Sequence, residues 1–217
     1  YTTTNHGPYT IPLKELGYDA ERVMPDVPES VRRDRALQKM LGTYWYCDKA
    51  TQEFIARMRA RFPDALFVVT GDHAHMPIRP GDTLARRDLT LRETFCTSFA
   101  LHHPMLDQTI LAGNTIGGHM NILPTLVELI APKGFYYASL FPPLTEPIDC
   151  VVTPYHWLTR EAIGAMDQPI WQTLDVTAEP LAVQQEADGK VRFADEAEGY
   201  MAVTNWLVRH PEGLEDA

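Results

Sequence analysis

The sequence lacks a long hydrophobic run. No window holds eighteen consecutive apolar residues, so no segment of this chain is expected to cross a membrane as a helix. The sequence is also poor in basic residues, with 19 Lys and Arg against 29 Asp and Glu. A nucleic-acid-binding protein needs a basic face. The formal net charge of -10 therefore argues against DNA or RNA as a partner.

Cysteine is scarce as well. The three cysteines, Cys47, Cys96 and Cys150, form no even, closely spaced framework, so we expect free thiols that pack as small apolar groups. The sequence shows no internal repeat and no low-complexity tract. It begins at Tyr1 with neither an initiator Met nor a signal peptide, and we expect it to be the later part of a longer protein.

A long amphipathic helix is predicted over residues 30–62. Apolar residues recur there at spacings of three and four, which defines one helical face. Ser30 can cap the start of this helix, and Pro63 forbids its continuation. The residues on the predicted apolar face are Leu37, Leu41, Tyr44, Cys47, Thr51, Phe54, Ile55, Met58 and Phe62.

Strands and helices alternate after this helix. Residues 66–70 read LFVVT, and a short, continuously apolar run is typical of a strand covered on both faces in a parallel sheet. Residues 94–102 predict a second strand. A helix follows, with Asn121 as its cap, Pro124 in its first turn and Pro132 as its end. This order predicts an α/β fold with a mostly parallel sheet flanked by helices.

The pattern changes after about residue 141. FPPLTEP is a proline-rich loop, and residues 148–158 predict a strand leading to a turn. Residues 180–208 predict a hairpin or meander around the turn signal Asp188-Gly189. We therefore expect an α/β portion over residues 1–140 and a small strand-rich C-terminal part over residues 141–217. Trp171 and Trp206 are expected to be core anchors of that part.

Asp72 and His73 directly follow the predicted strand LFVVT, in the segment Gly-Asp-His. Ligands of open α/β sheets collect at the carboxyl ends of strands. A carboxylate beside an imidazole suits zinc or manganese, and Gly71 lets the backbone turn sharply. The alternative is that Asp72 stabilises a turn and His73 is an ordinary surface residue.

Two further histidines stand at comparable places. His6 lies between a predicted strand end and a Gly-Pro turn, and His119 follows two glycines just before a predicted helix. The N-terminus of a helix favours an anion through its free N–H groups and its dipole. Each of these histidines could equally be a structural residue, but their order along the chain is distinctive.

That order resembles the C-terminal half of the sulfatase-like branch of the alkaline phosphatase superfamily, and within it the lipoteichoic acid synthases and related phosphoglycerol transferases. Three segments carry the resemblance: TNHGPY at residues 4–9, VVTGDH at residues 68–73 and HMNILPTLVEL at residues 119–129. Asp48 and the ASLFPPL stretch at residues 138–144 also fit. The resemblance covers residues 1 to about 145, and it implies an alkaline phosphatase-like fold that is only partly contained in this chain.

The resemblance also implies roles for individual residues. Asp72 and His73 would be metal ligands, with Mn²⁺ or Zn²⁺ as the expected ion and Mg²⁺ or Ca²⁺ as alternatives. His6 would contact the transferred group, and His119 matches a histidine that reaches a second metal or the substrate. Asn121 stands where the family has Asp, which removes a charge and argues against a two-metal centre. His75, His102 and His103 are expected at the rim of the site.

The implied reaction is transfer of a phosphoryl group, such as phosphoglycerol or phosphoethanolamine, or of a sulfuryl group, from a small or lipid-linked ester. The family's nucleophile and first acidic ligand precede the Asn-His-x-Pro-Tyr segment, so we expect this chain alone to be inactive. The parent protein would be a membrane-anchored transferase outside the cytoplasm, at the bacterial membrane or in the periplasm. A soluble sulfate or phosphate ester hydrolase and a non-catalytic metal- or ligand-binding relative are the alternatives.

Overall fold

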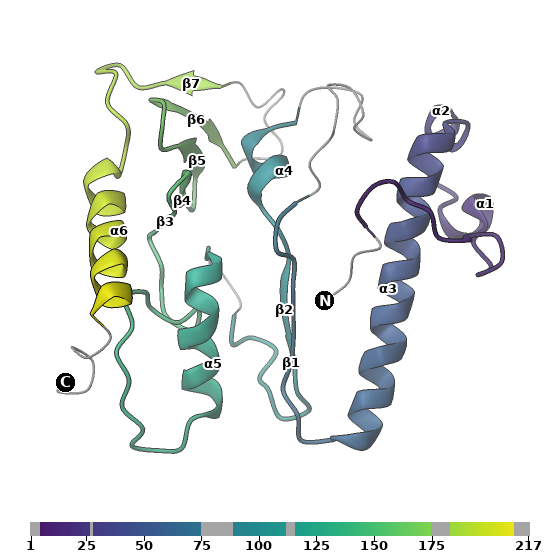
Figure 1. Ribbon diagram of the computed structural model, residues 1–217, viewed down its shortest axis with the longest axis horizontal. Coiled ribbons are helices and arrows are strands. Elements are labelled where there is room, and N and C mark those ends of the chain that lie inside the picture. Colours follow the sequence, from purple (N-terminus) through teal and green to yellow (C-terminus); the bar gives the residue numbers. More distant parts are fainter. Residues whose placement is uncertain (1–4, 27, 75–88, 112–115, 175–182, 211–217) are drawn as a thin grey trace. The chain divides into compact units, whose positions relative to one another are not determined.

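The computed structural model describes residues 5–26, 28–74, 89–111, 116–174 and 183–210. The chain divides into two compact units. The first comprises Tyr1–Leu89 and Thr97–Met105, and the second comprises Thr90–Cys96 and Leu106–Ala217. Both units contain helices and strands (Figure 1), which confirms the mixed α/β character.

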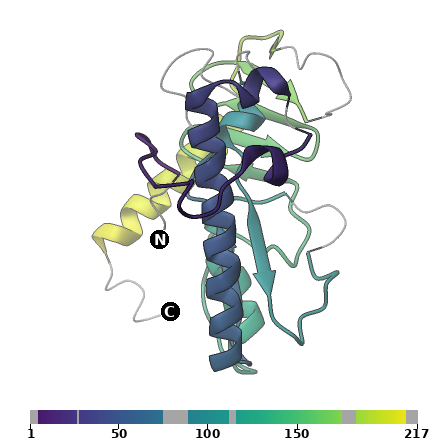
Figure 2. The ribbon, with the colours of Figure 1, turned by 90° about the vertical axis from the view of Figure 1, so that its right-hand side faces the viewer.

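The first unit is dominated by one long helix, α3 (Arg35–Arg61), which Figure 2 shows along its length. The side chain of Asp34 caps it by accepting hydrogen bonds from the N–H groups of Ala36 and Leu37. The helix ends just before Pro63, as predicted. The predicted start at Ser30 is wrong, because Ser30 lies in a separate short helix, α2 (Glu29–Arg32), which follows α1 (Ala20–Val23).

A small apolar core holds the N-terminal half of α3 in place. Its buried members are Val31, Leu37, Met40 and Leu41, with Tyr9, Met24 and Tyr44 packed against them. The predicted apolar face continues along the second half of α3, but there Phe54 is 59% exposed. Among the described residues, the predicted core face is therefore buried only where the N-terminal segments cover it.

The first unit also contains a two-stranded ribbon. Strand β1 (Phe67–Thr70) pairs with β2 (Phe99–His102) in antiparallel register, from Phe67 opposite His102 to Thr70 opposite Phe99. The strand predicted at residues 66–70 is confirmed, but Val68 and Val69 are exposed, so the predicted burial on both faces is not observed. The strand predicted over residues 94–102 is shorter than expected, because α4 (Leu91–Phe95) occupies its beginning.

The second unit is built on a five-stranded sheet in the order β3-β4-β5-β6-β7. The strands are β3 (Cys150–Val152), β4 (His156–Thr159), β5 (Ala162–Ala165), β6 (Ile170–Thr173) and β7 (Gln184–Gln185). Each neighbouring pair is antiparallel. Since β1 and β2 are antiparallel too, the prediction of a mostly parallel sheet is wrong for the part of the chain that the structure describes.

Threonines close two hairpins of this sheet. The hydroxyl of Thr153 accepts hydrogen bonds from the N–H groups of Tyr155 and His156 between β3 and β4. The hydroxyl of Thr159 does the same for Glu161 and Ala162 between β4 and β5. Short polar side chains that satisfy the backbone in this way stabilise tight turns. Residues 148–158 were predicted as one strand leading to a turn. They do contain a strand, β3, but the turn lies inside this run and is followed by most of β4.

The core of the second unit includes residues on both faces of this sheet, since all four residues of β5 and the neighbouring Val151 and Val152 of β3 are buried. Its buried apolar members include Leu144, Ile148, Val151, Val152, Trp157, Ile163 and Ala197. The helix predicted after Asn121 is confirmed as α5 (Ile122–Ile130), preceded by a 3-10 turn, η1 (His119–Asn121).

The C-terminal helix α6 (Ala194–Arg209) corrects a prediction, since these residues were expected in a hairpin or meander. The turn at Asp188 and Gly189 does form, with Gly189 at a φ of 69°, but it leads from β7 to this helix. Trp206 on α6 is 51% exposed, so it is not the core anchor that we expected. Within the described ranges, no helix combines the length and the apolar character that crossing a bilayer requires.

Candidate functional site

The predicted site begins where β1 ends, and the backbone there is held against the start of β2. The N–H of Gly71 donates to the carbonyl of Ser98 at 3.2 Å. The Thr70 hydroxyl lies within hydrogen-bond distance of the carbonyls of Ser98 (3.1 Å) and Gly71 (3.2 Å). These contacts extend the ribbon by one residue beyond the last strand pair. Asp72 is therefore the first residue that projects past the end of the ribbon.

Position 71 requires a glycine because the side chain of Thr97 lies very close to it, and not because of its backbone angle. A Cβ atom at this position would lie 2.0 Å from Oγ1 of Thr97. Real Cβ atoms do not come that near, so any other residue at position 71 would displace Thr97 or the turn. The glycine of the Gly-Asp-His segment thus has a steric reason that the sequence alone did not reveal.

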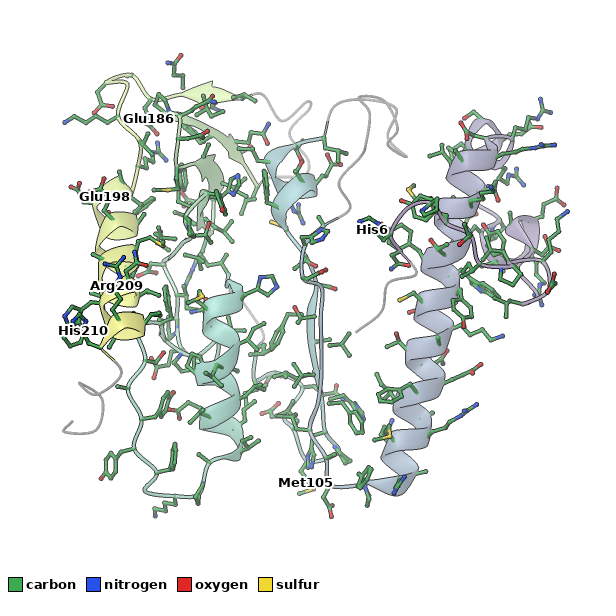
Figure 3. All side chains as sticks on the ribbon, viewed as in Figure 1. His6, Met105, Glu186, Glu198, Arg209 and His210 are labelled. Atoms are coloured by element: carbon green, nitrogen blue, oxygen red, sulfur yellow. The ribbon has the colours of Figure 1, made fainter. Side chains whose placement is uncertain are left out.

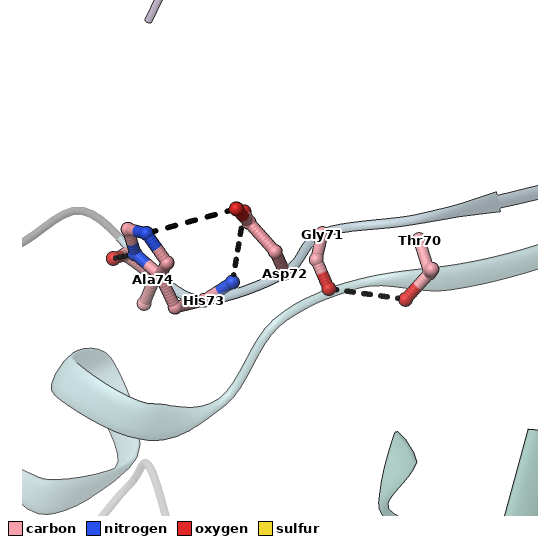
Figure 4. A network of polar contacts seen from close by, with 5 residues as sticks. All are labelled: Thr70, Gly71, Asp72, His73 and Ala74. Carbon is pink, nitrogen blue, oxygen red and sulfur yellow. Dashed lines mark hydrogen bonds and ion pairs between the residues drawn. The ribbon is translucent and has the colours of Figure 1, made fainter. Parts of the chain in front are cut away.

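Asp72 and His73 face each other beyond this turn (Figure 4). Oδ1 of Asp72 accepts a hydrogen bond from the backbone N–H of His73 at 3.0 Å. Nδ1 of His73 lies 2.8 Å from the carbonyl oxygen of Ala74. A carbonyl can only accept, so Nδ1 carries the proton. In the neutral imidazole the lone pair then resides on Nε2, which is 3.7 Å from Oδ2 of Asp72.

This geometry fits two ligands of a metal ion. Two donor atoms that are each about 2.1 Å from one tetrahedral ion lie about 3.4 Å apart, close to the 3.7 Å between Oδ2 and Nε2. Both side chains are 61% exposed, so an ion could reach them. The donor set is one carboxylate oxygen and one imidazole nitrogen, which suits Zn²⁺ or Mn²⁺. The hydrogen bond to Ala74 also fixes the ring, as ligand histidines require.

Two ligands do not complete a metal site. In the portion of the chain that the structure describes, no three His, Cys, Asp or Glu side chains gather so as to hold a metal ion. His6, on the loop that precedes α1 (Figure 3), is exposed, and its Nδ1 lies 3.0 Å from the carbonyl of Gly7. His6 is therefore not a third member of such a cluster with Asp72 and His73.

The predicted rim histidines fall elsewhere. Because the ribbon is antiparallel, His102 pairs with Phe67 and lies at the opposite end from Thr70 and Asp72. His103 follows it, and its Nδ1 accepts a hydrogen bond from the N–H of Met105 at 3.1 Å. The expectation that both lie near the end of β1 is wrong for this physical reason. His75 lies outside the described residues.

His119 belongs to the second unit, where it begins the turn η1 and is exposed. The Asn at position 121, two residues later, is only 1% exposed. Its Oδ1 accepts a hydrogen bond from the N–H of Gly118 at 2.8 Å, and its Nδ2 donates to the carbonyl of Pro142 at 2.9 Å. Asn121 thus bonds to the backbone of two loops and has a structural task.

Thr125 completes this arrangement and is 0% exposed. Its hydroxyl donates to the carbonyl of Asn121 at 2.6 Å and accepts from the N–H of Leu144 at 2.7 Å. We call Asn121 and Thr125, with the backbone groups of Gly118, Pro142 and Leu144, the polar latch. Buried polar groups that are fully hydrogen-bonded in this way specify one arrangement of the chain. The latch fixes the turn that carries His119.

Two side chains in distinctive surroundings, His156 and Arg192, were not predicted from the sequence. His156 stacks on Phe95 with ring centroids 3.6 Å apart, and burial lowers its pKa, while Asp167 raises it to a smaller extent. All three cysteines are free, as predicted, but Cys96 is exposed and does not pack as a buried apolar group. Burial raises the pKa of Cys96, and burial together with the charge of Glu196 raises the pKa of Cys150 to about 11. These two thiols are protonated at neutral pH and are weak nucleophiles.

The second missed group is an arginine held between two indoles. The guanidinium carbon of Arg192 lies 5.3 Å from the ring centre of Trp157 and 4.8 Å from that of Trp171, and its Nε contacts Glu186. Trp157 lies on β4 and Trp171 lies on β6, and β5 runs between these two strands. No local spacing in the sequence could therefore have indicated that both rings contact one arginine. Trp171 therefore serves as a packing residue, in line with the structural role expected for it.

No family model, no curated protein and no solved structure matches the chain. The resemblance to sulfatase-like enzymes thus stays a prediction, and it depends on the residues quoted above.

Proposed function

We propose that the protein is a metal-dependent enzyme that transfers or hydrolyses a phosphoryl or sulfuryl ester group, with Asp72 and His73 as two of its metal ligands. The observation that supports this proposal is the pairing of Oδ2 of Asp72 with Nε2 of His73 at 3.7 Å, on a solvent-exposed turn. The sequence resemblance independently assigns the same two residues to a metal site. The remaining metal ligands would be residues other than Asp72 and His73.

In this proposal each residue has a defined task. The Asp72 carboxylate supplies a hard oxygen donor. His73 would bind through Nε2, because its Nδ1–H donates a hydrogen bond to the carbonyl of Ala74. The bound ion would activate a hydroxyl nucleophile and offset charge on the ester oxygens. Following the resemblance, His6 would stabilise the charge that develops on the transferred group.

The proposal is tested first by metal binding. Calorimetric titration of this chain with Zn²⁺ or Mn²⁺ should show one weak site, with a dissociation constant near about 0.1 mM, because two ligands make an incomplete shell. Asp72→Ala should weaken that binding by about tenfold or more. Asp107→Ala is the matched control, since Asp107 also accepts hydrogen bonds within an exposed turn, from Thr109. Equal binding by both variants would contradict the assignment.

Turnover separates an enzyme from a binding protein. In the complete protein, Asp72→Ala should lower hydrolysis of an aryl phosphate or aryl sulfate ester by about 100-fold or more, along with bound metal. Retained metal with lost turnover would show that Asp72 is not a ligand. Metal binding without any ester turnover in the complete protein would favour the non-catalytic alternative.

A further inference from the structure

A shallow pocket lies in the second unit, between α5 and the loop that follows it. Its volume is about 390 Å³, and it is widely open to solvent. The lining residues that determine its chemistry are Glu128, Tyr137, Ser139, Phe141, Pro142 and Pro143. None of these residues takes part in the proposed metal chemistry, so the pocket goes beyond the proposed function.

The polar latch holds one part of the pocket lining, at Pro142. The carbonyl of Pro142 is bound by Asn121, and the N–H of Leu144 is bound by Thr125. Ser139 and Phe141 bind each other, because the Ser139 hydroxyl donates to the Phe141 carbonyl at 2.7 Å and lies 3.2 Å from its N–H. A wall held by this many hydrogen bonds is preformed, so a ligand would lose little free energy in ordering it.

One carboxylate gives the pocket its charge. The Tyr137 hydroxyl lies 3.2 Å from Oε1 of Glu128 and 3.3 Å from the carbonyl of Pro124, and can donate to both. Desolvation, followed by the hydrogen bond to Glu128 and its charge, raises the pKa of Tyr137, so the phenol stays a neutral donor at pH 7. Across the described ranges, no Lys, Arg or His forms an ion pair with Glu128.

Aromatic and proline side chains line the same pocket as this carboxylate. Phe141 is held by the ring of Tyr200, with centroids 4.8 Å apart. Tyr137 stays partly accessible, at 38% exposed. Aromatic faces attract cations through their quadrupole, most of all cations that carry apolar methyl groups and are weakly hydrated. From this combination we propose that the pocket binds a small organic ammonium ion, with its charge on Glu128 and its alkyl groups against Tyr137, Phe141 and the prolines.

Choline is the probe for this site, and 3,3-dimethyl-1-butanol is its uncharged carbon analogue. NMR titration of the chain with choline chloride should saturate with a dissociation constant of about 1–10 mM, and the uncharged analogue should not bind. Glu128→Gln keeps the shape of the side chain and removes the charge. It should weaken choline binding by about fivefold or more.

Glu198→Gln is the matched control, because Glu198 is an exposed glutamate on α6, outside the pocket (Figure 3). This variant should bind choline as the unchanged protein does. Three results would overturn the proposal: no saturable choline binding up to about 50 mM, equal binding of the uncharged analogue, or equal choline binding by Glu128→Gln and Glu198→Gln. Circular dichroism of both variants establishes that they are folded.

Discussion

Asn121→Asp should destabilise the protein by about 3–5 kcal/mol at neutral pH, even though the two side chains have almost the same shape. The amide of Asn121 donates to the carbonyl of Pro142. An ionised carboxylate cannot donate, so at a site that is 1% exposed one of its oxygens would face that carbonyl oxygen without a hydrogen bond. The measurement is the free energy of unfolding from urea titration followed by circular dichroism.

The pH dependence of this variant has a definite sign. Burial raises the pKa of the new carboxyl in the folded state above its ordinary value of about 3.9. The protonated acid can donate to Pro142 and accept from Gly118, as the amide does. The loss of stability relative to Asn121 should therefore be small below about pH 4 and should grow as the pH rises.

Asn121→Ala provides the control for this pH effect. It removes both hydrogen bonds without adding a titratable group, so its loss of stability should not depend on pH between about 4 and 7. A destabilisation of Asn121→Asp that is likewise independent of pH would contradict the buried, fully bonded position of residue 121.

Trp157→Ala should have the second large effect, a loss of about 3–5 kcal/mol. Trp157 is only 1% exposed. Its ring packs so closely over Gly164 that a Cβ there would lie 2.2 Å from the indole. It also contacts the ring of Phe193 in a tilted arrangement and the guanidinium of Arg192. Removing the indole leaves a cavity in the core. It also removes one of the two rings that the guanidinium of Arg192 contacts.

Trp206→Ala is the matched control for Trp157→Ala, because the same atoms are removed from a side chain that is 51% exposed. Its loss of stability should stay below about 1 kcal/mol. Urea unfolding of both variants gives the comparison. Similar losses at the two positions would show that the sheet does not bury Trp157 as described.

The elements that could be predicted from sequence are those whose signals are local. The spacing of Leu37 and Leu41 and the stop at Pro63 were sufficient for α3, and Asn121 and Pro132 delimited α5 within a residue or two. These signals depend on helical periodicity and on the backbone restriction of proline, and neither needs a distant partner. The existence of β1 was likewise predictable from its run of apolar and β-branched residues.

Strand direction was not predictable in this way. The run LFVVT was interpreted as a strand buried on both faces, whereas β1 pairs with β2 in an exposed antiparallel ribbon. A short apolar run does not encode the direction of its neighbour. The error moved His102 and His103 to the wrong end of the strand, which shows how one wrong pairing displaces several candidate residues.

The helix α6 was missed although its signal was present. The residues of α6 that are not exposed are spaced by three, three, four and three: Ala194, Ala197, Tyr200, Thr204 and Leu207. Asp195 and Glu196 in the first turn and Arg209 in the last are also favourable for a helix. The turn signal at Gly189 was correct, but it was assigned to a hairpin.

The candidate site also contains features that could be predicted from the sequence and features that could not. The adjacency of Asp72 and His73 could be read directly, but the contact between their side chains depends on the turn that follows β1. The role of Asn121 could not be read, because its partner Pro142 lies 21 residues further along the chain. Sequence comparison within a motif treats position 121 as a substituted ligand, whereas the structure places its side chain in a buried bond to the backbone.

The polar latch has a consequence for hydrogen exchange. The amides of Gly118 and Leu144 lie outside the helices and strands, yet each donates to a side-chain oxygen of a fully buried residue, at 2.8 and 2.7 Å. Loop amides usually exchange with solvent deuterium quickly, because they open independently of the core. These two can exchange only when Asn121 or Thr125 leaves its place, so both loops should open together with the N-terminal end of α5.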